Sequence, residues 1–386
     1  MKVLFITSCY PDELLPQYCI FIEQQAKALK ELGHEVDVIV PYPLKDDYKY
    51  EPSVSNGLKI YKVPYTVKSF KGVIFFRDVR FISNIIEILK KNDYDIVSIH
   101  YLLIDKVLEM CINACYYQNI KTVVHFHGLN VWKDYYHPHP IIQKFQSKRR
   151  KKILLKADCL VGVSKKVSKI IKERINNKPI FVVYNGVDTK KFISSKSDTN
   201  SNKLRIICVA NLIPIKGQQY LIDACCKMHE EGLDVELNLI GRGSDEKKLK
   251  ERVILQAAEN YVYFKGYIPY KQVIAELNKN DVFVMPSFFE ALGCVYLEAM
   301  SMKLPVIGVV GQGIDEIIID GNNGFLVEPQ SSASIYNKLK WIYDHKLESK
   351  EIAIKGFETV NNNYQWADSA KMLEKVYKMT MENEGR

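Results

Sequence analysis

The chain has 386 residues, of which 47% are hydrophobic and 26% charged, and this composition excludes a disordered, collagenous or coiled-coil protein. The length is sufficient for two domains, each with a core of its own. The net charge of +9 comes from residues 1–188, which hold 29 Lys and Arg against 19 Asp and Glu, and no run approaches the ~18 apolar residues of a membrane-spanning helix.

Strand-like runs alternate with helical patterns from the first residues onward. Residues 21–34 place Ile22, Ala26 and Leu29 on one face of a helix that ends at Gly33. Continuous apolar strands separated by helices indicate a parallel sheet that is covered on both faces. The strands predicted in the first half are VLFIT at 3–7, EVDVIV at 35–40, LKIYKV at 58–63, DIVSIHY at 95–101, TVVHFHG at 122–128, DCLVGVS at 158–164 and IFVVYNG at 180–186.

A polar stretch at 194–203 interrupts this alternation, which then resumes. The predicted organisation is a domain at 1–190, a linker at 191–203, a second domain at 204–364 and a C-terminal helix at 365–386 that returns to the first domain. The fold class is α/β, with two Rossmann-like doubly wound domains facing a cleft. The strands predicted in the second half are LRIICVAN at 204–211, VELNLIG at 235–241, VYFKGY at 262–267, VFVMPS at 282–287, PVIGVV at 305–310 and GFLVEP at 324–329.

The positive charge is densest between Lys144 and Lys156, a segment with seven Lys and Arg and no acid. Apolar residues interleave it, so we expect a basic amphipathic helix, which is either a solvated face or a surface for anionic lipid headgroups. No nucleic-acid-binding module accompanies the segment, so nucleic acid is not an expected partner. The nine cysteines form no CxxC pair, so we expect buried free thiols and a cytoplasmic protein, which the basic segment could place on the inner face of the membrane.

The segment from Pro286 to Gly308 carries the richest chemistry. A strand ends at Pro286, Glu290 follows in a loop, Gly293 allows a tight turn, and a helix begins near Cys294. The amides at such a helix start favour a phosphate. Glu298, on the second turn of this helix, could accept hydrogen bonds from a ribose diol, with Glu290 at the far end of a bound sugar nucleotide. The spacing alone is also explained if Glu298 is only an exposed helix residue and Glu290 only a charged residue in a loop.

The sequence EALGCVYLEAM, which begins at Glu290, resembles the E-x7-E signature of retaining glycosyltransferases of the GT-B fold, family 4. More than three quarters of the chain resembles that family in the same order. The resembling pieces include HFHGLNVW, ADCLVGVS, VVYNGVDTKKF, VANLIPIKGQQYLIDA, LIGRGSDEKKL and GQGIDEIIIDGNNGFLVEP.

This resemblance implies roles for individual residues. Lys216 corresponds to the lysine that neutralises the donor diphosphate, and His127 matches a histidine that faces the donor sugar. Asn211 stands where family members commonly have an arginine, so either Arg242 or Arg205 substitutes for that cation or Asn211 itself binds the phosphate. His125 is assigned the opposite strand parity from His127 and a structural role.

The resemblance implies catalytic roles for His127, Lys216 and Glu290, and nucleotide binding by Asn211, Lys216, Gly293, Cys294 and Glu298. No metal or other cofactor is expected.

The predicted function is that of a retaining glycosyltransferase of the hexosyltransferase class, which moves a sugar from a nucleotide diphosphate sugar, UDP-sugar in the first instance. The acceptor would be a hydroxyl of a cell-envelope glycan or a lipid-linked oligosaccharide precursor, of capsule or exopolysaccharide type. A dehydrogenase is disfavoured because the first strand is not followed by G-x-G-x-x-G. A glycoside hydrolase that uses the paired carboxylates is a rival. The non-enzyme alternative is a sugar-nucleotide-binding module of an envelope-assembly complex.

Overall fold

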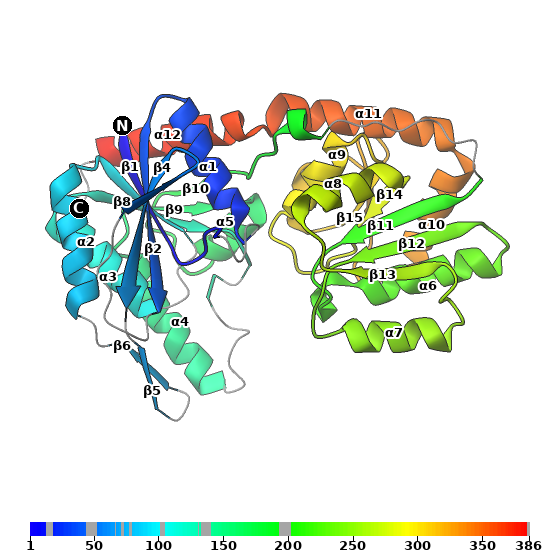
Figure 1. The fold of residues 1–386 in the computed structure, drawn as a ribbon, viewed down its shortest axis with the longest axis horizontal. Helices are drawn as coiled ribbons and strands as arrows, with labels where there is room; N and C mark the ends of the chain where they lie inside the picture. Colours follow the sequence, from blue (N-terminus) through cyan, green and yellow to red (C-terminus); the bar gives the residue numbers. More distant parts are fainter. Residues whose placement is uncertain are drawn as a thin grey trace. The chain divides into compact units, whose positions relative to one another are not determined.

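The computed structural model describes residues 1–12, 18–43, 52–65, 67–70, 73–76, 79–100, 105–129, 131–132, 140–192 and 202–383. The chain divides into two compact units, and Figure 1 labels their helices and strands. Unit 1 consists of Met1–Asn185 and Trp366–Arg386, and unit 2 consists of Gly186–Gln365. Most of the predicted linker, residues 193–201, lies outside the described residues.

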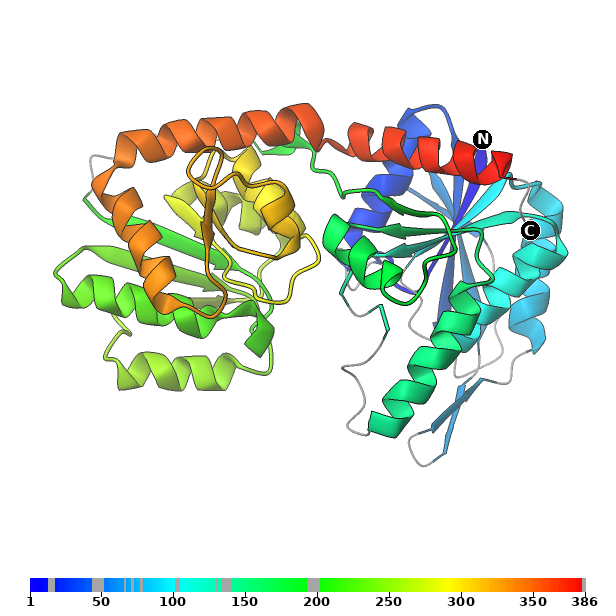
Figure 2. The same ribbon diagram turned by 180° about the vertical axis from the view of Figure 1, so that it is seen from behind.

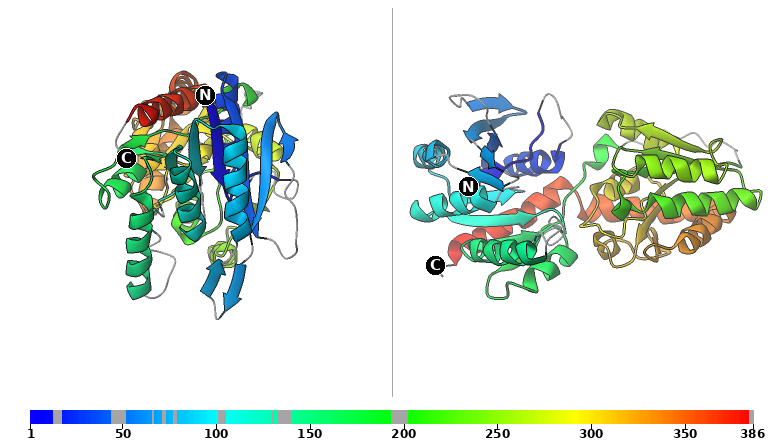
Figure 3. Two further views of the ribbon diagram at one scale, coloured as in Figure 1. Left: turned by 90° about the vertical axis from the view of Figure 1, so that its left-hand side faces the viewer. Right: turned by 90° about the horizontal axis from the view of Figure 1, so that it is seen from below.

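Unit 1 is built on an eight-stranded sheet in the order β10-β9-β8-β7-β1-β2-β4-β3. Every neighbouring pair in this sheet is parallel except β3 with β4. Strands β5 and β6 form a separate antiparallel hairpin, visible apart from the sheet in Figure 3. The strands are β1 (Lys2–Thr7), β2 (Glu35–Pro43), β3 (Pro52–Ser55), β4 (Leu58–Tyr65), β5 (Val67–Phe70), β6 (Val73–Phe76), β7 (Ile96–His100), β8 (Lys121–Phe126), β9 (Cys159–Gly162) and β10 (Ile180–Val182).

The helices of unit 1 cover this sheet. The predicted apolar face of the first helix is correct, since Ile22, Ala26 and Leu29 are all fully buried, and Gly33 follows the helix with a φ of +90°. The helices are α1 (Ile20–Glu31), α2 (Val79–Asn92), α3 (Asp105–Tyr117), α4 (Pro140–Leu154), α5 (Lys165–Lys172) and α12 (Trp366–Glu382).

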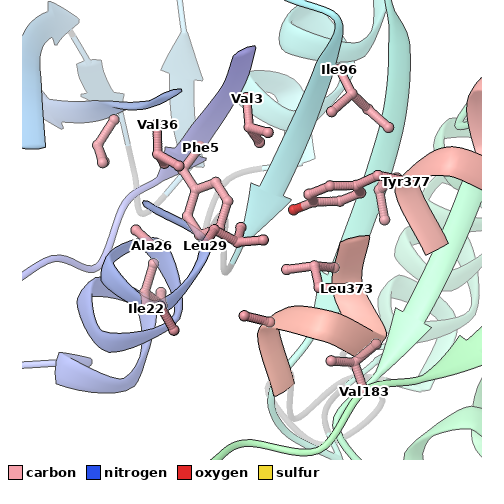
Figure 4. Packing of buried hydrophobic residues seen from close by; sticks show 14 of the residues in the cluster. Val3, Phe5, Ile22, Ala26, Leu29, Val36, Ile96, Val183, Leu373 and Tyr377 are labelled. Atoms are coloured by element: carbon pink, nitrogen blue, oxygen red, sulfur yellow. The ribbon is translucent and has the colours of Figure 1, made fainter. Parts of the chain in front are cut away.

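The last helix, α12, completes the core of the first unit. Figure 2 shows α12 beside α1, and the two helices pack against each other. Leu373 and Tyr377 of α12 are fully buried among residues of α1 and the sheet, such as Phe5, Leu29 and Ile96 (Figure 4). The hydrophobic core of unit 1 therefore joins residues from both ends of the sequence.

Unit 2 contains a six-stranded, fully parallel sheet in the order β13-β12-β11-β14-β15-β16. Its strands are β11 (Leu204–Val209), β12 (Val235–Ile240), β13 (Val262–Gly266), β14 (Val282–Val284), β15 (Val306–Val309) and β16 (Phe325–Val327). Its helices are α6 (Gln218–Glu230), α7 (Glu246–Leu255), α8 (Tyr270–Lys279), α9 (Cys294–Ser301), α10 (Ser332–Asp344) and α11 (Lys346–Asn363), with short 3₁₀ turns η1 (Thr189–Lys191), η2 (Pro214–Lys216) and η3 (Gly313–Glu316).

The predicted fold class is confirmed, because both units are α/β structures built on parallel sheets. Strand β3 is an antiparallel addition that the sequence analysis missed. Asn56 and Gly57, which join β3 to β4, both have positive φ, and an Asn-Gly pair of this kind forms the tight turn of a hairpin. All nine cysteines are free, as predicted, and seven of them are buried. Among the described residues, no helix combines the length and the apolar character needed to cross a bilayer.

Candidate active site

The carboxyl edge of the unit 2 sheet is the natural place for a ligand. From β11 the strand order runs outward through β12 to β13 and then returns to β14 on the other side of β11. Ligands of open α/β sheets bind beside the carboxyl ends of the strands where the order reverses in this way. The loops at that point are residues 210–217 after β11 and 285–293 after β14, which we call the switch-point loops.

Backbone contacts tie the two switch-point loops together. The carbonyl oxygen of Ile215 accepts hydrogen bonds from the Phe288 amide at 3.0 Å and the Ser287 hydroxyl at 3.2 Å. Gly217 has a φ of +70°, and a Cβ there would lie 2.3 Å from the carbonyl oxygen of Pro286. Only glycine fits at this position, so the loops approach each other as closely as two backbones can.

Lys216 and Glu290 form an ion pair across the switch point. Lys216 ends η2, and its Nζ donates to Oε2 of Glu290, with only 16% and 12% of the two side chains exposed. The backbone amide of Glu290 donates to Oε1 of the buried Gln312 at 3.0 Å, so a third loop fixes the backbone at Glu290. Removing either partner of such a pair would leave a poorly solvated single charge.

Helix α9 begins beside this pair. Its N-cap is Gly293, which has a φ of +80° and offers no side chain to the amides of the first turn. A Cβ on Gly293 would lie 2.8 Å from the ring of Tyr296. The hydroxyl of Tyr296 donates to the carbonyl oxygen of Met285, which ties the new helix to the end of β14. Cys294, the first helical residue, is partly buried at this end of the helix.

Glu298 lies on the second turn of α9, and Oε1 accepts a hydrogen bond from the Tyr270 hydroxyl at 2.9 Å. Burial raises the pKa of Glu298 from 4.5 to about 7, and the Tyr270 hydrogen bond partly opposes this rise. Burial is also the largest cause of a raised pKa at Tyr270, followed by the nearby Glu298 charge. Tyr270 therefore remains a neutral donor to a carboxylate that ionises near neutral pH.

The structure separates the two arginines considered as substitutes at Asn211. Asn211 is exposed on the first switch-point loop. Arg205 lies at the amino end of β11, where it pairs with Asp281, so it is at the wrong edge of the sheet. Arg242 follows β12 on the neighbouring loop, and its carbonyl oxygen accepts from the Leu212 amide at 2.9 Å. Of the two, Arg242 is the cation near the switch-point loops.

In unit 1, His127 belongs to a group of four polar side chains, Ser98, His100, His125 and His127, which we call the histidine cluster. His100 Nδ1 lies 3.0 Å from His127 Nε2, and Ser98 Oγ lies 2.9 Å from Nε2 of both His100 and His125. The parity assigned to His125 was wrong. Residues two positions apart along a strand point to the same face of the sheet. The rings of His125 and His127 are nearly parallel, with an angle of 10° between their planes.

Burial lowers the pKa of all three histidines, to about 3 for His127, so the histidine cluster is uncharged at neutral pH. These histidines are the group that could hold a metal among the described residues, since one nitrogen from each lies within 4.8 Å of the others. The lone pairs lie in the ring planes, however, and the rings of His100 and His125 stack face to face at 4.1 Å and 14°. Near-parallel rings cannot direct all three lone pairs at one ion, so we assign no metal here.

Two family models match the chain, one to each unit. Residues 20–191 match Glycosyltransferase Family 4, and residues 189–358 match Glycosyl transferases group 1. The chain belongs to the family 4 glycosyltransferases.

Known proteins resemble this glycosyltransferase over most of its length. An uncharacterised glycosyltransferase of Methanocaldococcus jannaschii is 26% identical, with 98% of each chain covered. The alpha-monoglucosyldiacylglycerol synthase of Acholeplasma laidlawii is 25% identical over 77% of this chain and 78% of its own. The solved structure of Anabaena HepE with UDP and glucose has a TM-score of 0.75 at 17% identity, covering 98% of this chain and all of the other. These likenesses are to glycosyltransferases of the GT-B fold, as the sequence predicted.

Several residues of the glycosyltransferase's candidate site were not found from its sequence. Ser98, His100, Gln312 and Tyr270 contact the predicted residues but carry no motif. A signal existed for His100, because parallel pairing of the two predicted strands DIVSIHY and TVVHFHG sets it opposite His125. The Lys216–Glu290 pair, the Glu298 carboxylate and the start of α9 lie together on unit 2, whereas His127 belongs to unit 1.

Proposed function

We propose that this glycosyltransferase transfers a sugar from a nucleotide diphosphate sugar, with UDP as the first nucleotide to test. The observation that carries the proposal is the Lys216–Glu290 ion pair at the switch point of a Rossmann-type sheet. Glu298 lies nearby in sequence, on helix α9. A partly buried lysine beside a helix start is suited to a diphosphate. The Anabaena HepE structure, a complex with UDP and glucose, supports the choice of UDP.

In this proposal, each group in unit 2 has a separate task. Lys216 Nζ and the amide end of α9 bind the diphosphate, with Arg242 as a second cation on the neighbouring loop. Oε2 of Glu298 accepts hydrogen bonds from the ribose diol while Oε1 stays bonded to Tyr270. Glu290 restrains the lysine and contacts the sugar. His127 of unit 1 serves the transfer step, as the family resemblance implies.

We further propose that the transfer retains configuration by substitution on the front face. The bond between the anomeric carbon and the diphosphate oxygen breaks, and a bond from the acceptor oxygen forms on the same face. The acceptor proton passes to the departing phosphate oxygen, so the charges balance without a metal or a covalent enzyme intermediate. Lys216 stabilises the charge that develops on the leaving group, which accelerates the reaction only if this contact strengthens in the transition state.

The acceptor in this proposal is a hydroxyl of a cell-envelope glycan or of a lipid-linked precursor. The name of the Acholeplasma synthase, which makes a glucosylated diacylglycerol, supports a membrane-associated acceptor. Helix α4 provides a second argument. The exposed side chains on it include four lysines and an aromatic residue that is 70% exposed: Lys144, Phe145, Lys148, Lys151 and Lys152.

Not every cation of the segment from Lys144 to Lys156 is available to lipid. Arg150 is buried and pairs with Asp105 at 2.6 Å, and Arg149 and Lys156 both pair with Glu109. The four exposed lysines therefore carry the proposed attraction to an anionic membrane surface, at ~1 kcal/mol each near the bilayer.

The function is tested by incubating the purified full chain with a panel of nucleotide sugars and measuring nucleotide release with and without lipid-linked or glycan acceptors. Acceptor-dependent release of UDP, with the anomeric configuration of the product read by NMR, would support the proposal. Tight binding of UDP-sugars with no release from any pairing would favour the non-catalytic module. Hydrolysis of simple glycosides that is lost on changing either glutamate would favour a hydrolase.

The membrane surface is tested by sedimentation with liposomes that contain an anionic lipid. Changing the four exposed lysines of α4 to Gln should abolish binding, whereas four matched changes on unit 2 should not. Unaltered sedimentation of the α4 variant would exclude this role of the helix. The matched control set is Lys247→Gln, Lys248→Gln, Lys350→Gln and Lys355→Gln, all at exposed positions.

A further inference from the structure

The histidine cluster forms a continuous hydrogen-bonded chain that ends at His127. Strands β7 and β8 run parallel with His100 opposite His125, so both rings lie on one face of the sheet. The contacts run from His125 through Ser98 and His100 to His127 at 2.9, 2.9 and 3.0 Å. Phe5 packs on His100 at 4.3 Å and Phe21 on His127 at 4.8 Å between ring centroids, which holds the rings in place.

Proton counting leaves two arrangements for the contact between His100 and His127. A neutral imidazole has one N–H and one lone pair, and a serine hydroxyl donates once. Because both nitrogens of His100 are engaged, one must donate and the other must accept. In the first arrangement His127 Nε2–H donates to His100 and His100 donates to Ser98, while Ser98 either donates to His125 or accepts from it. In the second arrangement Ser98 donates to His100, His100 donates to His127, and Nδ1 of His127 carries the proton.

The second ring nitrogen of His127, at the end of the hydrogen-bonded series, distinguishes these arrangements. Nδ1 of His127 is buried and has no hydrogen-bond partner among the residues that the structure describes. A buried N–H without an acceptor is a rare and costly group, whereas an unused lone pair is tolerated more readily. The first arrangement leaves only a lone pair on this atom, so it is the one that the protein favours by itself. A lone pair that has no partner can accept a hydrogen bond from the hydroxyl of a bound substrate.

We propose that Ser98 and His100 are positioning residues, which hold His127 in the tautomer protonated at Nε2 and so present Nδ1 as an acceptor to a substrate hydroxyl. This proposal rests on the proposed role of His127 in sugar transfer. The relation resembles the general case in which a group behind a histidine fixes its tautomer and orientation, a contribution that can dominate the rate. His125 lies at the other end of the hydrogen-bonded series, in contact with Ser98.

The first test reads the tautomers directly. Two-dimensional NMR of the full chain with ¹⁵N-labelled histidine distinguishes protonated Nε2 from protonated Nδ1 through the coupling of each nitrogen to the ring protons. We expect His127 to show protonated Nε2 in the wild type and a mixture of tautomers in His100→Phe. Protonated Nδ1 in the wild type would overturn the proposal. So would displacement of all three ring signals by stoichiometric Zn²⁺, which would make the cluster a metal site.

The second test compares three variants in sugar transfer. His100→Phe keeps the stacked ring but removes both hydrogen bonds, so turnover should fall by about tenfold or more. His100→Gln keeps an acceptor for His127 and a donor for Ser98, so it should restore most of the activity. His345→Phe is the matched control, because His345 stacks on Trp341 in unit 2 at 4.7 Å.

The results separate this inference from the proposed function. Equal activity of wild type and His100→Phe, or equal loss in the Phe and Gln variants at unchanged melting temperature, would overturn the positioning role. If the wild type transfers no sugar, the proposed function fails and the claim about a substrate hydroxyl fails with it. The NMR measurement would still decide which tautomer of His127 the histidine cluster imposes.

Discussion

The two units place opposite kinds of chemistry at corresponding places in their folds. In unit 2 the loops after β11 and β14 carry the charged groups Lys216 and Glu290, and Glu298 follows on α9. In unit 1 the ends of β7 and β8, beside the point where the strand order reverses at β1, carry neutral histidines. The comparison teaches that strand order determines where a ligand can bind, whereas the loop side chains decide whether charge or neutral hydrogen bonding meets it.

The sharpest way to break this comparison is to remove the charge from unit 2. Lys216→Ala should lower kcat by about 10²–10³, because the leaving diphosphate loses its cation and Glu290 is left without a partner. Nucleotide affinity should fall much less, since the charge of a bound diphosphate is spread over several oxygens, whereas in the transition state new charge develops on the leaving oxygen. Steady-state kinetics and calorimetric titration with UDP measure the two quantities.

The control for this change is Lys248→Ala, which alters an exposed lysine of α7 and should change neither quantity. An equal loss in turnover and in affinity would contradict the prediction, because it would mean that Lys216 attracts the substrate and the transition state alike.

The second change, at Glu298, should have opposite effects on nucleotide affinity and on the stability of the free protein. Glu298→Gln keeps an acceptor for Tyr270 but cannot be a carboxylate, so nucleotide affinity at pH 8 should fall by about 1.5–3 kcal/mol, a factor of roughly 10–150. The same variant should melt at a higher temperature than the wild type at pH 8 without ligand, since no charge is then buried. Calorimetric titration and differential scanning calorimetry give the two numbers, and a lower melting temperature would refute the second.

The pKa of Glu298 also gives this prediction a pH dependence. Between its ordinary pKa of 4.5 and the raised value of about 7, the folded protein holds a proton that the unfolded chain has released. This group therefore makes the free energy of unfolding fall as the pH rises through that interval. Nucleotide affinity should rise as the pH passes through about 7, where the carboxylate of the folded protein ionises and becomes the better acceptor. A pH-independent affinity in the wild type would show that Glu298 does not meet the ribose.

The smallest expected effect sharpens the same point. Tyr270→Phe removes the hydrogen bond that lowers the pKa of Glu298, so the pKa should rise above about 7. At pH 7 the affinity for UDP should fall several-fold, a cost of about 1 kcal/mol, and at pH 8.5 most of it should return. An equal loss at both pH values would mean that Tyr270 contacts the nucleotide itself.

Local patterns in the sequence were sufficient to predict the fold class and to locate most of the strands along the chain. Apolar runs mark strands such as VELNLIG, and the periodicity of Ile22, Ala26 and Leu29 marks α1, because these signals are short-range. The family resemblance directed attention to Lys216, Glu290 and Glu298. Their roles stay predictions, since they depend on substrates.

The partners of these residues could not be predicted in the same way. Lys216 meets Glu290 across 74 positions of sequence, and Tyr270 meets Glu298 across 28. Such contacts depend on which strands become neighbours, and this information is not local. The charge of α4 was overestimated for the same reason, because Asp105, which pairs with Arg150, lies 45 positions away on α3.

Helix α12 imposes an order on how the protein can be made. Domains generally fold from the N-terminus as synthesis proceeds, yet the core of unit 1 lacks Leu373 and Tyr377 until all of unit 2 has been translated. At ~5–20 residues per second, this interval lasts roughly 10–40 s. For that time the apolar surface that α12 covers in the folded protein has no cover from α12, and such a surface favours aggregation.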